Sequence, residues 1–234
     1  MLIEDPWIQL RQLTAARIAL GRAGHALPTG ELLAFQLAHA KARDAVLRAL
    51  DLGHFRALDP LALKSAAPDR ATYLRRPDLG RRLAPDSALQ LSAGNWDAAI
   101  VIADGLSAAA VEQSAVPFVE AMKSHLPDWR FARICVVQQG RVAIADEIGE
   151  RLGALFSVIL IGERPGLSSP DSMGVYLTCR PRVGRTDAER NCISNIRPGG
   201  LRIDRAADRA AKLMIAARQQ QLTGVGLRFT PSLL

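Results

Sequence analysis

Two polar segments follow apolar stretches in the second half of the chain, and both carry side chains that could bind a ligand. Residues 155–161 run directly into Gly162-Glu163-Arg164-Pro165-Gly166, where glycine and proline favour a turn over a helix or strand. About thirty residues later, a second apolar stretch is followed by Asn191-Cys192-Ile193-Ser194-Asn195. In open α/β sheets, ligands bind outside the carboxyl ends of the strands. We therefore predict that Glu163 and the Cys192 thiol lie in two loops that wall a small-molecule or cofactor site.

Short apolar runs and helical patterns alternate around these loops. We predict strands at 98–103, 133–137, 155–161 and 174–179, and helices at 108–126, 142–152 and 205–222. Such alternation is typical of parallel strands joined by right-handed crossover connections. The predicted fold class is therefore α/β, with a doubly wound, mostly parallel, Rossmann-like sheet in a domain at 95–234.

The first 94 residues have a different pattern, which predicts a helical N-terminal extension and a connection. Residues 1–50 are typical of helix, loop and helix, and Thr29 is a candidate N-cap of the second helix. Residues 51–95 are rich in Pro, Gly, Asp and Arg, so we expect an irregular connection there.

Composition and cysteine usage limit the cellular context. No uncharged apolar run of about 18 residues occurs, so no transmembrane helix is expected. The start of the chain is acidic and lacks a basic segment followed by an apolar one, which argues against a secretory signal. Cys135, Cys179 and Cys192 form no CxxC pair, so neither a zinc site nor a disulfide framework is indicated. These features favour a cytoplasmic protein.

The formal net charge of +7 would permit a nucleic-acid partner. However, arginines are interleaved with acidic residues along the chain, and the one local cluster is Arg75, Arg76, Arg81 and Arg82. Tyr73 is the sole aromatic residue near that cluster, which makes a poor stacking platform for bases. A solvated face or an acidic protein partner is therefore favoured over nucleic acid.

The two polar segments and several others resemble one known family in sequence and in order. The chain is similar over most of its length to the small subunit of ethanolamine ammonia-lyase, an enzyme that depends on adenosylcobalamin. The similar segments are Arg17–Leu50, Tyr73–Leu83, Asp97–Ala115, Val137–Glu150, GERPGLSSPDS from Gly162 and DAERNCISNIR from Asp187.

This resemblance implies a site and a partner. In the family, the residues that match Val142, Glu163 and Cys192 contact the cobalamin, and the catalytic barrel belongs to the large subunit. The chain would then form a hetero-oligomer that converts ethanolamine to acetaldehyde and ammonia, while carrying no catalytic group and no metal ligand itself. No Asp-x-His sequence occurs, so the cofactor should keep its own dimethylbenzimidazole as lower ligand. Family members often have a longer N-terminal tail that aids packaging into a bacterial microcompartment.

The residues alone leave other roles open. Glu163 could form a surface ion pair with Arg164, Cys192 could be a small buried thiol, and Val142 could be an ordinary first-turn contact. The turn at 104–107 could be a ligand-binding helix start or a plain turn with Ser107 as N-cap. A stand-alone corrinoid-binding module is the alternative to a subunit role.

Overall fold

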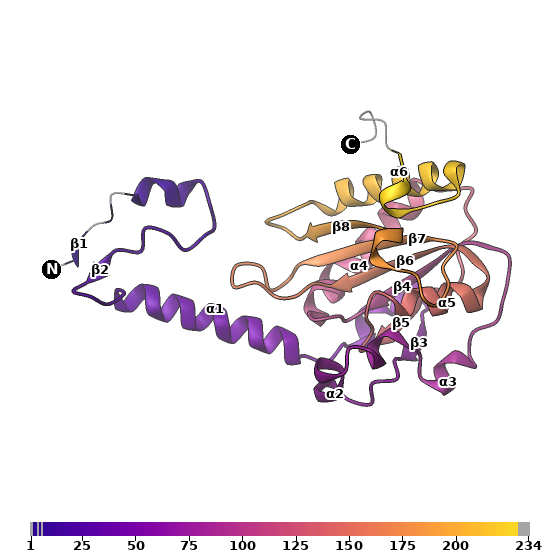
Figure 1. The fold of residues 1–234 in the computed structure, drawn as a ribbon, viewed down its shortest axis with the longest axis horizontal. Helices are drawn as coiled ribbons and strands as arrows, with labels where there is room; N and C mark the ends of the chain where they lie inside the picture. The colour runs from indigo at the N-terminus through magenta and orange to yellow at the C-terminus, as the bar shows by residue number, and fades with distance from the viewer. Residues whose placement is uncertain (1, 4, 6, 229–234) are drawn as a thin grey trace.

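The computed structural model describes residues 2, 3, 5 and 7–228, and its centre is one six-stranded sheet (Figure 1). The strand order is β3-β5-β4-β6-β7-β8. The first four strands in this order pair with one another in parallel. Strand β7 pairs antiparallel with β6, and β8 pairs antiparallel with β7. The predicted α/β class with a mostly parallel sheet is therefore confirmed. The strands are β3 (Leu61–Lys64), β4 (Trp96–Ala103), β5 (Cys135–Gln138), β6 (Ala154–Gly162), β7 (Met173–Cys179) and β8 (Arg190–Ile196).

Three long helices pack on the two faces of this sheet. The predicted helices at 108–126, 142–152 and 205–222 are present as α4 (Ala108–Ser124), α5 (Ile144–Leu152) and α6 (Ile203–Gln220). Helices α4 and α6 cover one face, and α5 packs on β4 and β6 from the other. Shorter helical segments are Ile8–Gln12, Leu52–Leu58, Arg70–Arg75, Leu79–Arg81, Pro85–Ala88, Asp187–Glu189 and Gly224–Gly226.

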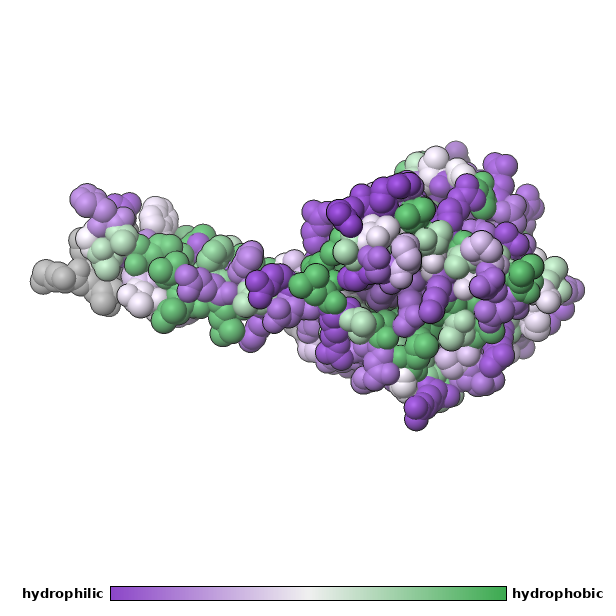
Figure 2. Space-filling model, turned by 90° about the horizontal axis from the view of Figure 1, so that it is seen from below, coloured by the Kyte–Doolittle hydropathy of each residue, from purple (hydrophilic) through white to green (hydrophobic). Residues whose placement is uncertain are grey.

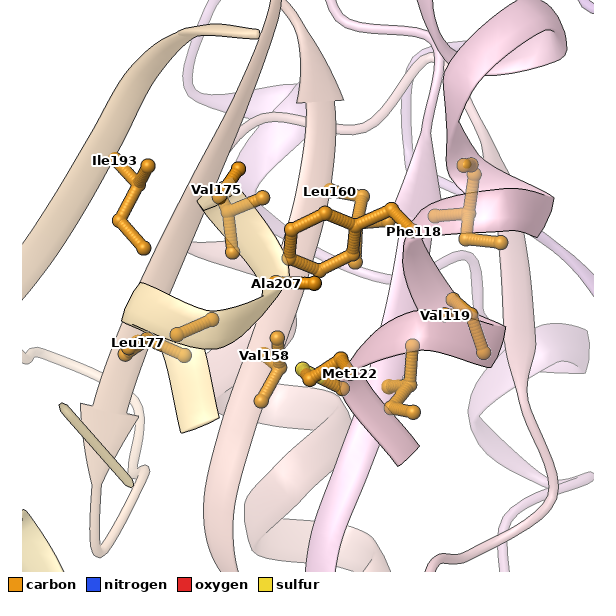
Figure 3. Close-up of a cluster of buried hydrophobic side chains, with 14 of the residues drawn as sticks. Phe118, Val119, Met122, Val158, Leu160, Val175, Leu177, Ile193 and Ala207 are labelled. Atoms are coloured by element: carbon orange, nitrogen blue, oxygen red, sulfur yellow. The ribbon is translucent and has the colours of Figure 1, made fainter. Parts of the chain in front are cut away.

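Alternation along each strand divides the core into two layers. In β4, Ile100 and Ile102 point to the α4–α6 face, and Val101 points to the α5 face. Figure 3 shows the larger layer, where Phe118 and Met122 of α4 meet apolar side chains from β6, β7 and β8. Full burial of one such large side chain contributes about 1.5–3 kcal/mol. This layer therefore fixes the positions of the strands whose other face carries the candidate site.

The prediction of a fourth parallel strand at 174–179 was wrong in direction. Strand β7 pairs antiparallel with β6, with Ile161 opposite Gly174 and Ile159 opposite Tyr176. The connection runs from residue 163 to residue 172, which is ten residues. A parallel crossover needs a dozen residues or more, usually with a helix. The chain can only turn back at this point.

Two segments expected to be irregular are strands. The segment 191–195, predicted as a polar loop, lies within β8, where Ile193 and Ile196 face the α6 side and Cys192 faces the opposite side. The strand bends at Asn195, whose φ is +60°. Within the segment 51–95, β3 forms the edge of the sheet beside β5.

The N-terminal part projects away from this body (Figures 1 and 2). Its main element is α1 (Thr29–Leu47), which has no buried residue, and a small antiparallel pair joins β1 (Leu2–Ile3) to β2 (Arg22–Ala23). The N-cap position of α1 is occupied by Pro28, so Thr29 is its first residue and not its cap. No helix in the described part of the chain is long and apolar enough to cross a membrane.

Candidate ligand site on the open face of the sheet

The three residues singled out from the sequence lie on the α5 side of the sheet. Val142 follows β5, Glu163 follows β6, and Cys192 lies in the middle of β8. Tyr176 of β7 connects them. It lines the same cavity as Val142, stands directly across from Cys192 in the strand pairing, and packs against the α5-side core. Burial raises the pKa of Tyr176, and the nearby Cys192 and Glu163 raise it further.

A cavity of about 460 Å³ opens beside Val142 and Tyr176. Arg190 lines it and forms a buried ion pair with Asp146, in which two guanidinium nitrogens each lie 2.6 Å from a carboxylate oxygen. Burial raises the pKa of Asp146 even though Arg190 opposes the shift. The other lining residues are Arg81, Arg141, Ala143, Arg185, Thr186 and Asp187.

Glu163 links the neighbouring ends of β6, β7 and β8. Its Oε2 accepts a hydrogen bond from Ser172 Oγ at 2.5 Å and one from the Asn195 N–H at 3.3 Å. Its own N–H donates to the Ser172 carbonyl at 2.9 Å. Beneath the carboxylate lies Gly174, where a Cβ would stand 2.8 Å from Oε1. No ion pair with Arg164 occurs among the described residues, so the surface-pair alternative is not supported.

Cys192 is exposed, which rules out the alternative of a small buried thiol. Its pKa is raised by the partial desolvation of its sulfur against the sheet and by Glu163, while a hydrogen bond with Tyr176 acts in the opposite direction. The thiol is therefore protonated at neutral pH and is a poor nucleophile. None of the four histidines lines the cavity next to it.

The loop that carries Val142 is held by Asp104 and Tyr73, for which the sequence indicated no such role. Asp104 Oδ1 accepts from the Gly140 N–H at 3.1 Å, and the Tyr73 hydroxyl donates to the Gly140 carbonyl at 3.1 Å. The ring of Tyr73 lies between two guanidinium groups, with Arg70 at 4.8 Å and Arg141 at 4.5 Å from its centroid. These contacts fix the loop before α5 begins.

Asp104 and Arg70 also occupy the crevice between the carboxyl ends of β4 and β5. The chains leaving these two strands turn to opposite faces of the sheet, which is where open α/β folds usually bind ligands. Here Arg70 Nη1 lies 3.2 Å from Asp104 Oδ2, and burial raises the pKa of Asp104 to about 6. The side chains of Arg70 and Asp104 occupy this crevice. The open cavity lies elsewhere on the sheet, beside Tyr176 of β7.

The turn at 104–107 leads into α4 with Ser107 at the N-cap position, as one of its two expected roles predicted, but the hydroxyl has a different hydrogen-bond partner. Ser107 stands at the N-cap position of α4 but makes no capping hydrogen bond. Its hydroxyl donates instead to the Pro170 carbonyl at 2.7 Å, which ties the 163–172 loop to the start of α4. Gly105 has a φ of +52°, and a Cβ there would lie 2.3 Å from the Gly162 carbonyl oxygen, so the approach requires glycine.

The groups in this arrangement can be compared with what a metal ion or a large polar ligand would need. Among the described residues no cluster of three or more His, Cys, Asp or Glu side chains is placed to hold a metal ion. The side chains of a corrin end in amides, which both donate and accept hydrogen bonds. Oε1 of Glu163 has no donor within the described part of the chain, and the exposed Cys192 and partly buried Tyr176 offer an apolar surface beside it. The residues present therefore fit a large ligand of this kind.

Fold and site together define an α/β protein with a mostly parallel sheet, one face of which is left partly uncovered beside β7 and β8. A sequence model of the family described as ethanolamine ammonia-lyase light chain matches residues 4–228. The chain is 58% identical over 239 residues to the ethanolamine ammonia-lyase small subunit of Azotobacter vinelandii, covering 96% of this chain and 88% of that relative. Proteins of the same name from Pseudomonas fluorescens and Pseudomonas putida are 52% and 54% identical, over 97% and 96% of this chain and 87% and 88% of theirs. The chain belongs to the ethanolamine ammonia-lyase light-chain family, which confirms the resemblance seen in its sequence.

Proposed function

We propose that this protein is the small subunit of an ethanolamine ammonia-lyase, and that it forms a hetero-oligomer with a large subunit. The enzyme converts ethanolamine to acetaldehyde and ammonia. The observation that carries the proposal is the identity of more than half of the aligned residues to proteins of that name over nearly the whole chain. The open face with Glu163, Tyr176 and Cys192 supports it, because a subunit that covers a cofactor needs such a surface.

Adenosylcobalamin, when bound, supplies the radical chemistry that this deamination requires. In this proposal, Glu163 accepts hydrogen bonds from corrin amides and orients the cofactor. Val142 makes an apolar contact at the rim, and Cys192 contacts the ligand beside Tyr176. The described part of the chain has no set of eight βα units, and in this proposal the barrel that encloses the substrate belongs to the large subunit.

The division of the chain predicted from its sequence also stays a proposal. We infer a cobalamin-contacting domain at 95–234 with a doubly wound, Rossmann-like arrangement, which is supported by helices on both faces of the sheet. We infer a helical N-terminal extension and connection at 1–94, supported by the projecting helix α1, although β3 from this part joins the same sheet. The protein would act in the cytoplasm or within a bacterial microcompartment.

Co-expression with the large subunit tests this function. We expect the two chains to purify as one complex that releases acetaldehyde from ethanolamine when adenosylcobalamin is added. A stand-alone corrinoid-binding module would instead bind the cofactor tightly by itself and show no stable association with the large subunit. Failure of the complex to form or to deaminate ethanolamine would overturn the proposal.

A further inference from the structure

The cavity beside Val142 has positive charge that the protein does not neutralise. Arg185 and Arg190 line it, and each pairs with a carboxylate. Arg81 and Arg141 also line it, but neither has a carboxylate within ion-pair distance among the described residues. The acidic lining residue Asp187 is already paired with Arg190 at 3.4 Å. The net charge of the lining therefore favours an anion.

Arg141 is held in place by contacts that leave part of its hydrogen-bonding capacity unused. Its guanidinium stacks on the Tyr73 ring, and Nη2 donates to the Tyr73 carbonyl at 3.2 Å. Its backbone N–H donates to the Gly80 carbonyl at 2.7 Å, which brings the segment of Arg81 against it. The buried Nε has no acceptor. A guanidinium fixed in this way loses little conformational entropy when it binds a ligand.

The backbone of the same wall adds further donors. Val142 and Ala143 line the cavity just before α5, which begins at Ile144 and is nine residues long. Within the described part of the chain no acceptor bonds the N–H of Val142 or of Ala143. Free N–H groups at the start of a helix favour negatively charged ligand groups. Two arginines without a carboxylate partner and two residues with unbonded backbone N–H groups thus line one cavity.

We propose that this cavity binds a phosphodiester, the one in the nucleotide tail of cobalamin, through Arg81, Arg141 and the N–H groups of Val142 and Ala143. The inference rests on the proposed function, which places a cobalamin that keeps its own lower base against this face. A phosphodiester carries one negative charge at neutral pH and offers two oxygens that match the guanidinium fork. The cavity lies in the volume range of ligand pockets, so it has room for the phosphate with its ribose. Its wall at Tyr176 continues to Cys192, so one ligand can reach both.

Three corrinoids that differ in their tails allow the contribution of the phosphate to affinity to be measured separately from that of the rest of the ligand. Adenosylcobalamin contains the phosphodiester and the base, adenosylcobinamide phosphate retains a phosphate without the base, and adenosylcobinamide has neither. Their affinities are measured by absorbance titration of the complex of both subunits, with no turnover needed. We expect Arg81→Gln and Arg141→Gln each to weaken the first two ligands about ten-fold and to leave adenosylcobinamide unchanged. Arg141→Lys, which keeps the charge, should recover part of the loss.

A matched control is Arg182→Gln. Arg182 is exposed and does not line this cavity but a second one, beside the starts of β4 and β6, so all three affinities should stay at the wild-type value. Equal weakening of all three corrinoids by Arg141→Gln and Arg81→Gln, or no weakening, would overturn the phosphate site. Binding of inorganic phosphate, followed by phosphorus NMR, would also overturn it if adenosylcobalamin does not displace the ion. If the wild-type complex binds none of the corrinoids, the proposed function itself fails.

Discussion

Gly174→Ala should displace the carboxylate of Glu163 while leaving the chain folded. The new Cβ would stand 2.8 Å from Oε1 of Glu163 and 3.3 Å from its Cγ. Ordinary contacts of a Cβ begin near 3.4 Å, so the carboxylate must move by about 0.6 Å. Gly174 has no positive φ, so alanine fits the strand backbone. The neighbour that must move is the end of a flexible side chain.

The effects on stability and on binding should differ in size. Replacing glycine by alanine stabilises by about 0.4–1 kcal/mol through the unfolded chain. The hydrogen bonds from Ser172 and Asn195 to the Glu163 carboxylate are worth about 1.5–3 kcal/mol each, and a shift that weakens them without breaking them costs about 1 kcal/mol each. The free energy of unfolding should therefore change by only about 1 kcal/mol. A lost charge-assisted hydrogen bond to the cofactor is worth about 1.5–3 kcal/mol, which weakens adenosylcobalamin binding by about 10- to 100-fold.

The assay is an absorbance titration of adenosylcobalamin into the complex of both subunits, with urea unfolding of the same variants. Glu163→Gln should weaken binding by about three- to thirty-fold, because the amide retains neutral hydrogen bonds. Gly30→Ala is the control, since a Cβ at this position of α1 meets no atom within 4 Å. If both Gly174→Ala and Glu163→Gln bind the cofactor as the wild type does, Glu163 only braces the strands. The site must then be drawn around Val142 and Cys192.

Three further predictions follow from the same structure. The purified chain with adenosylcobalamin should release no acetaldehyde from ethanolamine, because it has no barrel to shelter the reaction; measurable acetaldehyde would contradict this. Isotopic labelling of histidine should leave the paramagnetic resonance spectrum of the cob(II)alamin form unchanged, and a new splitting would mean that a histidine coordinates cobalt. Burial raises the pKa of Asp104 from 3.8 to about 6, so ionisation of this carboxyl destabilises the folded state relative to the unfolded chain. Between pH 4 and pH 6, the free energy of unfolding of the wild type should therefore fall by about 2 kcal/mol relative to that of Asp104→Asn. Above pH 6 the difference in free energy of unfolding between the two proteins should level off. If urea unfolding shows that the wild type instead gains stability relative to Asp104→Asn between pH 4 and pH 6, the raised pKa of Asp104 is refuted.

Hydropathy was enough to predict the buried strands but not their directions. The runs that became β4 and β6 are continuous and apolar because both of their faces are covered, which is typical of central strands. Strand β7 has the same kind of composition, yet it runs the other way. The signal that distinguishes it is the length of its connection to β6, which is too short for a crossover helix.

Site residues could be predicted only where their position depends on the local chain. Val142 and Glu163 follow strand ends, so their place near the edge of the sheet was predictable from apolar runs and turn residues. Cys192 was expected in a loop because its neighbours Asn191 and Ser194 are polar, but it lies within β8. Ser194 is exposed on this strand, and the side-chain amide of Asn191 is hydrogen-bonded to the backbone of Gly224. Its closeness to Tyr176 depends on strand register, which single-sequence patterns specify weakly on an exposed face.

The two faces of the sheet differ in how completely helices cover them. On the α4–α6 side, apolar side chains from β4, β6, β7 and β8 are all covered by helices, and this layer holds the strands in register. On the other side, α5 packs on β4 and β6 but leaves Tyr176 partly buried and Cys192 exposed. A second helix over β7 and β8 would bury this surface and close the site. The antiparallel return of the chain after Glu163 avoids such a crossover helix, so the short 163–172 connection keeps the face open to a ligand or to a partner subunit.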